Sequence, residues 1–124
     1  MKTEKKSDRI KDLCGKLRLK AIADNFEELE GSAGDYEDFL YQLLSLESDA
    51  ADDRLVESRI RAARFPSRKY LDDLIVDKLP VGIQRALPEI STLNFIDQGK
   101  NLIFVGNPGT GKTHTAIGLG IKAC

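Results

Sequence analysis

A glycine-rich run near the end of the printed sequence constrains this chain more than any other feature. Residues 106–113 read Gly-Asn-Pro-Gly-Thr-Gly-Lys-Thr, a full match to the phosphate-binding loop pattern G-x-x-x-x-G-K-[ST]. The apolar run 102–105 precedes the loop, and residues 113–123 carry an apolar helical face after it. This order predicts a buried parallel strand over 101–105, then the loop and then a helix, as in an α/β fold.

Each residue type in this loop has a physical reason. The glycines at 106, 109 and 111 permit backbone torsions and close approaches that a Cβ would block. Successive backbone N–H groups and the following helix N-terminus can then face an anion. We expect Lys112 to reach the β- and γ-phosphates of a nucleotide and the Thr113 hydroxyl to bind Mg²⁺. The predicted nucleotide site is Gly106, Asn107, Pro108, Gly109, Thr110, Gly111, Lys112, Thr113 and His114. His114 either senses the neighbouring nucleotide or is a surface or packing residue of the helix.

Length and composition limit the remaining classes. A chain of 124 residues is about one small domain. No stretch approaches the ~20 apolar residues that a membrane span needs, and no apolar core follows the basic N-terminus as in a secretory signal. Cys14 and Cys124 have no partner at metal-ligand spacing, and a reducing cytoplasm is the simplest compartment.

The pattern upstream of the loop predicts helices. Apolar residues recur at helical spacing over 8–30 and indicate one helix, which the glycines at 31 and 34 end. Asp35 is a good N-cap for a second helix, whose predicted apolar face is Phe39, Leu40, Leu43, Leu44 and Leu46. Nothing breaks that helix before Pro66. We therefore predict a helical hairpin domain over 1–66, a connector with short helices over 67–100, and a P-loop core over 101–124.

The net charge of −1 conceals a division into blocks. Residues 1–20 hold eight basic and three acidic side chains, and residues 21–53 hold eleven acids and no base. Residues 54–70 hold six bases and one acid. This last stretch is either a phosphate-contacting surface for DNA or a solvated helix face that pairs with the acidic block. The candidate DNA contacts are Arg54, Arg59, Arg61, Arg64, Arg68 and Lys69.

The chain resembles the N-terminal half of an IstB-type transposition helper ATPase. The resemblance rests on Arg-Ala-Ala-Arg-Phe-Pro at 61–66, which stands about forty residues before the loop, and on Leu-Arg-Leu-Lys-Ala-Ile-Ala at 17–23. The loop alone is specific only for phosphate-loop ATPases. The IstB-type family is similar to DnaC-type helicase loaders, and both belong to the AAA+ class.

The resemblance implies binding of ATP and Mg²⁺, binding of duplex DNA, assembly into a homo-oligomer and regulation of a partner transposase. A family member continues for roughly as many residues again, through the acidic Walker B strand, a polar sensor and an arginine finger. None of these has a counterpart here, so the AAA+ domain is expected to be incomplete and ATP hydrolysis by this chain alone close to nil. Whether the chain is an enzyme stays open. The alternatives are a DnaC-like helicase-loader fragment and a non-catalytic helical DNA-binding or interaction module with a vestigial loop.

Overall fold

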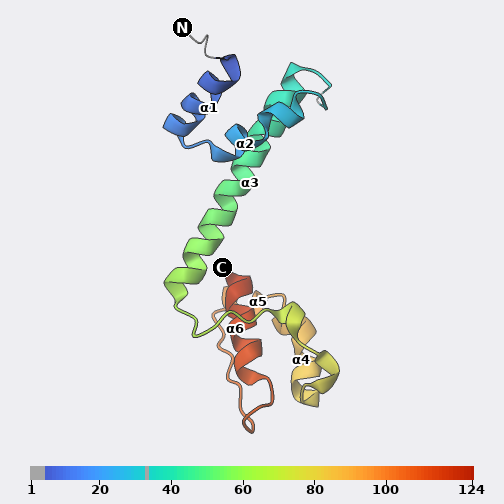
Figure 1. Ribbon diagram of the computed structural model, residues 1–124. Helices are drawn as coiled ribbons and strands as arrows, with labels where there is room; N and C mark the ends of the chain where they lie inside the picture. Colours follow the sequence, from blue (N-terminus) through green and yellow to red (C-terminus); the bar gives the residue numbers. More distant parts are fainter. Residues whose placement is uncertain (1–4, 33) are drawn as a thin grey trace. The chain divides into compact units, whose positions relative to one another are not determined.

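The computed structural model describes residues 5–32 and 34–124, and it divides the chain into two compact units, Met1–Val56 and Glu57–Cys124 (Figure 1). The α-helices are α1 Lys6–Leu17, α2 Lys20–Leu29, α3 Tyr36–Ala63, α4 Val81–Ile90, α5 Asn94–Asp97 and α6 Lys112–Ala123. Two 3₁₀ turns, η1 Leu71–Asp73 and η2 Val76–Lys78, stand between α3 and α4. The boundary between the two units falls within α3. In the described part of the chain, no helix combines the length and the apolar character needed to cross a membrane.

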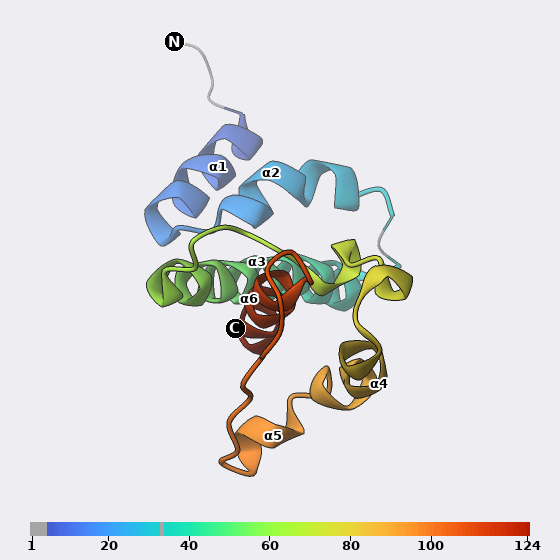
Figure 2. The same cartoon turned by 90° about the horizontal axis from the view of Figure 1, so that it is seen from below.

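The helix expected over 8–30 is interrupted at Arg18. Arg18 adopts a left-handed conformation with φ 57°, and its N–H bonds to Gly15 O, while the N–H of Leu19 bonds to Cys14 O at 2.8 Å. These two bonds close α1 with the pattern that glycine usually makes at a helix end. The prediction of one helix was wrong because neither glycine nor proline marks this break. After the break, α2 packs against α1 (Figures 1 and 2).

The start of α3 is capped as the sequence predicts, since Asp35 Oδ1 accepts the N–H of Asp38 at 2.8 Å. A second cap joins α3 to α2: the carboxylate of Glu47 accepts the N–H of Ile22 at 2.9 Å, in the first turn of α2. Glu47 is buried, as are Phe26 of α2 and Leu43 of α3. This small core and the buried carboxylate hold the first unit together.

The second unit is built around α6. Ile117 and Ile121 of α6 form a buried cluster with Ile60, which lies in the last turns of α3, and Phe65 packs against this cluster. Gly120 makes the approach of Phe65 possible, because a Cβ at this position would lie 2.6 Å from the Phe65 ring. The helix after the glycine loop is therefore well anchored by the end of α3.

The expected strand over 101–105 is wrong, and with it the α/β class. In residues 5–32 and 34–124 the structure contains no strand or sheet, and 101–105 is irregular. Ile103 is 86% exposed and Val105 is 90% exposed, so this run is not a buried core strand. A strand requires a neighbour that satisfies its backbone N–H and C=O groups, and no described segment lies beside it as one. An apolar run of four residues was not enough to predict a sheet.

Candidate nucleotide-binding site

The turn before α6 depends on two of its three glycines. Gly109 and Gly111 have φ values of 77° and 84°, in the region that side-chain-bearing residues avoid. A Cβ on Gly111 would also lie 2.7 Å from Leu79 Cδ2. Gly106 has no positive φ, and a Cβ there would meet its nearest neighbours at 3.6 Å, an ordinary contact. The motif therefore marks three glycines, of which two are needed for the observed backbone.

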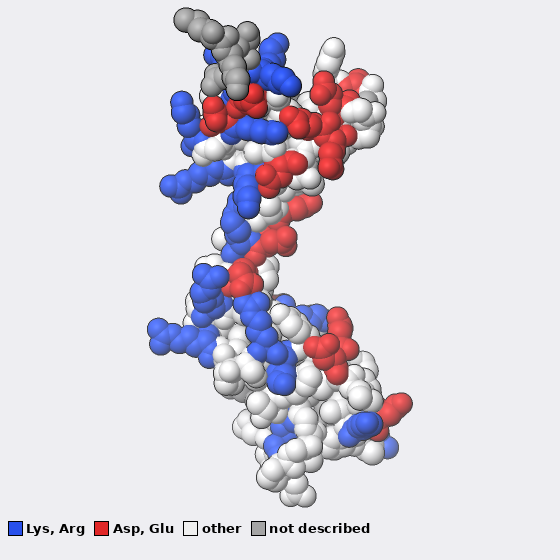
Figure 3. All heavy atoms as spheres, in the orientation of Figure 1, with Lys and Arg blue, Asp and Glu red and all other residues white. Residues whose placement is uncertain are grey.

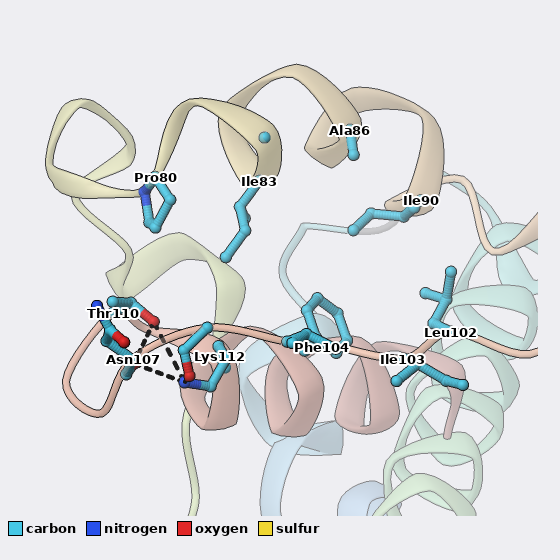
Figure 4. A pocket seen from close by; sticks show the side chains of 13 residues that line it. Pro80, Ile83, Ala86, Ile90, Leu102, Ile103, Phe104, Asn107, Thr110 and Lys112 are labelled. Carbon is cyan, nitrogen blue, oxygen red and sulfur yellow. Dashed lines mark hydrogen bonds between the residues drawn. The ribbon is translucent and has the colours of Figure 1, made fainter.

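The Lys112 side chain folds back into the loop. Its ammonium nitrogen donates to the carbonyl of Gly106 and, at 2.6 Å, to the carbonyl of Asn107. It lies 3.5 Å from the hydroxyl of Thr110, which itself donates to Asn107 O at 2.9 Å (Figure 4). An ammonium has three hydrogens, and the contact to Thr110 is at the limit of a hydrogen bond. A phosphate oxygen could take that third hydrogen while the two carbonyl bonds keep the side chain in place.

The N-terminus of α6 leaves backbone donors available beside this ammonium. Gly111 is the N-cap and supplies no side-chain cap, and the first intrahelical bond runs from Thr115 N–H to Gly111 O at 2.9 Å. The N–H groups of the first turn precede that bond and have no intrahelical acceptor. They point toward the loop with the positive end of the helix dipole. Lys112 and these donors together provide the chemistry that a phosphate group requires.

A cavity of about 500 Å³ adjoins the loop (Figure 4). One wall is apolar and comes from the start and body of α4, and the polar end is formed by the loop and Lys112. The apolar wall consists of Pro80, Ile83, Ala86 and Ile90. These residues belong to the predicted connector over 67–100, and their place beside the loop was not predicted from the sequence. Pro80 as a helix start with apolar residues three and six positions later was the signal available in the sequence.

Thr113 and His114 follow Lys112 in the first turn of α6. Thr113 is exposed, so its hydroxyl is accessible to a metal ion that bridges to a bound phosphate. No cluster of three carboxylate, imidazole or thiol groups suited to a metal ion occurs within 5–32 and 34–124. Thr113 is the residue of the loop that would hold Mg²⁺ beside phosphate oxygens, and oxygen ligands of this kind suit Mg²⁺. His114 Nε2 lies 2.7 Å from Tyr70 O, and since a carbonyl only accepts, Nε2 carries the proton.

The structure divides the six candidate DNA-contacting residues. Arg54 belongs to the first unit, and the other five belong to the second. Arg59 donates to Cys124 O at 3.0 Å, while Arg64 ends α3 in a left-handed conformation with φ 55°. Arg61 and Arg68 both approach Glu57, the single acid of this stretch.

The Glu57–Arg68 pair is a two-bond fork. Arg68 donates to both carboxylate oxygens of Glu57, to Oε2 at 3.1 Å and to Oε1. The hydrogen bond from Arg68 lowers the pKa of Glu57 below its ordinary value of 4.5, and the charge of Arg61 adds to this shift. The same hydrogen bond raises the pKa of Arg68, so both groups are charged at neutral pH. Arg68 is thus partly neutralised within the chain, whereas Arg61 keeps only a 4.0 Å contact with Glu57.

Comparisons with known proteins agree on one family. The family model described as IstB-like ATP binding protein matches residues 12–124. The chain is 33% identical over 120 residues to the "Insertion sequence IS5376 putative ATP-binding protein" of Geobacillus stearothermophilus, covering 94% of this chain and 48% of that protein. It is 33% identical over 115 residues to the "Insertion sequence IS21 putative ATP-binding protein" of Pseudomonas aeruginosa, covering 90% and 43%. The chain therefore spans about half the length of the curated relatives it matches.

Proposed function

The chain belongs to the IstB-like ATP-binding protein family, and from that premise we propose that residues 106–114 bind ATP with Mg²⁺ in the service of DNA transposition. The observation that carries the proposal is the position of the Lys112 ammonium inside the loop, at an α6 N-terminus that lacks a side-chain cap. Relatives named after insertion sequences support the transposition context. Duplex DNA, a transposase and further copies of the chain are the proposed partners.

In the proposed complex, the first-turn N–H groups of α6 and Lys112 hold the phosphates. The Thr113 hydroxyl would be the protein ligand of Mg²⁺, and the ion would neutralise part of the phosphate charge. The apolar wall of α4 beside the loop suits the base, because nucleotide sites pair a few polar groups with apolar packing.

Calorimetric titration with Mg-ATP tests the nucleotide site. The parent chain should bind, Lys112→Ala should lose binding by at least about tenfold, and Lys100→Ala is the matched control because Lys100 is outside the loop and its cavity. Thr113→Ala should remove the difference between titrations with and without Mg²⁺. Ile83→Ser should weaken ATP but leave inorganic triphosphate unchanged. Equal binding by the parent and Lys112→Ala would refute the phosphate role of the loop.

The basic stretch is the proposed DNA contact, and all of its candidate residues except Arg54 lie in the second unit. Arg61 and Arg64 are exposed, and neither is held by a bidentate acid. Each phosphate contact adds about 0.9 to the slope of log affinity against log salt. Arg61→Ala with Arg64→Ala should lower both the affinity for a duplex and that slope. Glu57→Gln should raise both, because it releases Arg68 from its fork. A duplex affinity that neither change alters would remove this stretch from the proposed interface.

A further inference from the structure

Two exposed helix faces in the first unit have apolar side chains and opposite charge. The basic face of α1 is Lys6, Arg9, Leu13, Lys16 and Leu17. The acidic face of α3 is Glu37, Leu40, Tyr41, Leu44, Asp52 and Leu55. The members of each set recur at spacings that place them on one side of their helix. On the side shown in Figure 3, Lys and Arg gather over α1, and Asp and Glu gather over the turn before α3 and along its first half.

The core of the first unit does not cover the apolar residues of these two faces. The buried side of α3 carries Leu43 and Glu47, yet on the other side Tyr41 is 72% exposed and Leu44 is 55% exposed. On α1, Cys14 is buried while Leu17 is 67% exposed. Contiguous exposed apolar residues of this size are typical of interaction surfaces.

Charge decides which surface fits the acidic face. The charged members of this α3 face are the acids Glu37 and Asp52, with no base among them, so two copies of the face placed against each other would repel. A suitable occupant is a helix with leucines flanked by lysine and arginine, and α1 is such a helix. Lys11, which lies on the inner side of α1, already pairs with Glu27 at 3.2 Å and lies over the Phe26 ring.

Because both faces are exposed within one copy, we propose that the basic face of α1 in one copy docks on the acidic face of α3 in a second copy. Leu13 and Leu17 pack against the apolar residues of α3, and the charges at the rim set the orientation. Each copy carries both faces, so a two-fold pair makes the contact twice. This surface deepens the self-assembly proposed above, but it shares no residue with the nucleotide site or with the six candidate DNA contacts.

Sedimentation equilibrium of the chain, without nucleotide or DNA, tests this contact. The first variant combines Arg9→Glu with Lys16→Glu, and the second combines Glu37→Lys with Asp52→Lys. Each variant alone places like charges across the interface, so its dissociation constant should rise by at least about tenfold. An equimolar mixture should restore association, because the reversed α1 of one variant then matches the reversed α3 of the other.

Two controls separate this contact from folding and from the nucleotide proposal. Asp97→Lys makes the same type of charge change in the second unit and should leave the measured mass unchanged. Lys112→Ala should also leave it unchanged, so failure of the nucleotide site and failure of this contact are distinguishable. Circular dichroism should show parental helix content in every variant. The proposal is overturned if the parent stays monomeric up to roughly 100 µM, or if the mixture does not associate better than either variant alone.

Discussion

The glycines of the loop offer a graded test of the structure, because alanine should have a different effect at each of three positions that the motif treats alike. Gly111 combines a φ of 84° with a Cβ position 2.7 Å from Leu79 Cδ2. Gly109 has a φ of 77° but open space around the missing Cβ. Gly106 has neither a positive φ nor a close neighbour. Alanine should therefore introduce both backbone strain and crowding at Gly111, backbone strain alone at Gly109, and neither effect at Gly106.

The expected costs follow from these differences. A left-handed conformation costs a residue with a side chain about 1–2 kcal/mol, and this applies to Gly109 and Gly111. Crowding adds about 1 kcal/mol at Gly111, at the low end of overpacking costs because the contacted atom is the end of the Leu79 side chain. Alanine also lowers the entropy of the unfolded chain, worth about 0.4–1 kcal/mol in favour of folding. The net change in the free energy of unfolding is then a loss of about 2 kcal/mol at Gly111, a loss of about 1 kcal/mol at Gly109, and a small gain or no change at Gly106.

Urea unfolding followed by far-ultraviolet circular dichroism measures this series, with the two units allowed separate transitions. The losses should appear in the transition of the second unit, which contains all three positions. Titration with Mg-ATP on the same variants should follow the same order, since the turn precedes the α6 donors that we propose hold the phosphates. Equal losses at all three glycines, or the largest loss at Gly106, would show that the loop has a different backbone from the one described.

Three further predictions concern helix ends and an ion pair. Arg18→Gly should stabilise the first unit by about 1 kcal/mol, because Arg18 has a left-handed conformation at the end of α1; urea unfolding measures this, and a loss of stability would contradict it. Glu47→Ala should destabilise the same unit by about 1–2 kcal/mol by removing the acceptor of the Ile22 N–H, whereas Glu47→Gln, which keeps an oxygen there, should cost less. The Glu57–Arg68 pair should stabilise the second unit above pH 4.5 and lose its effect as the pH falls through the lowered pKa of Glu57. The thermal midpoints of the parent and Glu57→Gln should therefore differ at pH 7 and converge once the pH is below the lowered pKa of Glu57; a constant difference would disprove the linkage.

Local signals in the sequence predicted the cap of α3 and the helix that follows the loop. Asp35 was expected to cap α3 and does so through the N–H of Asp38. The helix after the loop is present as α6 and begins at Lys112. These features depend on side chains a few residues apart, so the sequence holds all the information they require.

Features that depend on distant neighbours were not predicted. The run 101–105 has the composition of a strand, but strand formation depends on a pairing segment, and no described segment provides one. Arg18 follows α1 in a left-handed conformation although a side chain disfavours it, and the chain turns there so that α2 packs against α1. The approach of Leu79 to Gly111 likewise joins positions 32 residues apart, from 79 to 111. The glycine loop of the candidate site was therefore predicted from the sequence, whereas the apolar wall that α4 contributes was not.

Which side of α3 is buried is another feature that the sequence alone did not predict. Leu43 and Leu44 are adjacent leucines in one predicted apolar face, yet Leu43 is 8% exposed and Leu44 is 55% exposed. Periodicity predicts that the helix is amphipathic, but apolar residues on two sides leave its orientation undetermined. Glu47 resolves this, because a carboxylate one turn after Leu43 is buried only where it can accept a hydrogen bond, here from Ile22 at the start of α2. The buried acid therefore marks the part of α3 that is covered within the unit, and the exposed Leu44 belongs to the face on which we propose that a second copy docks.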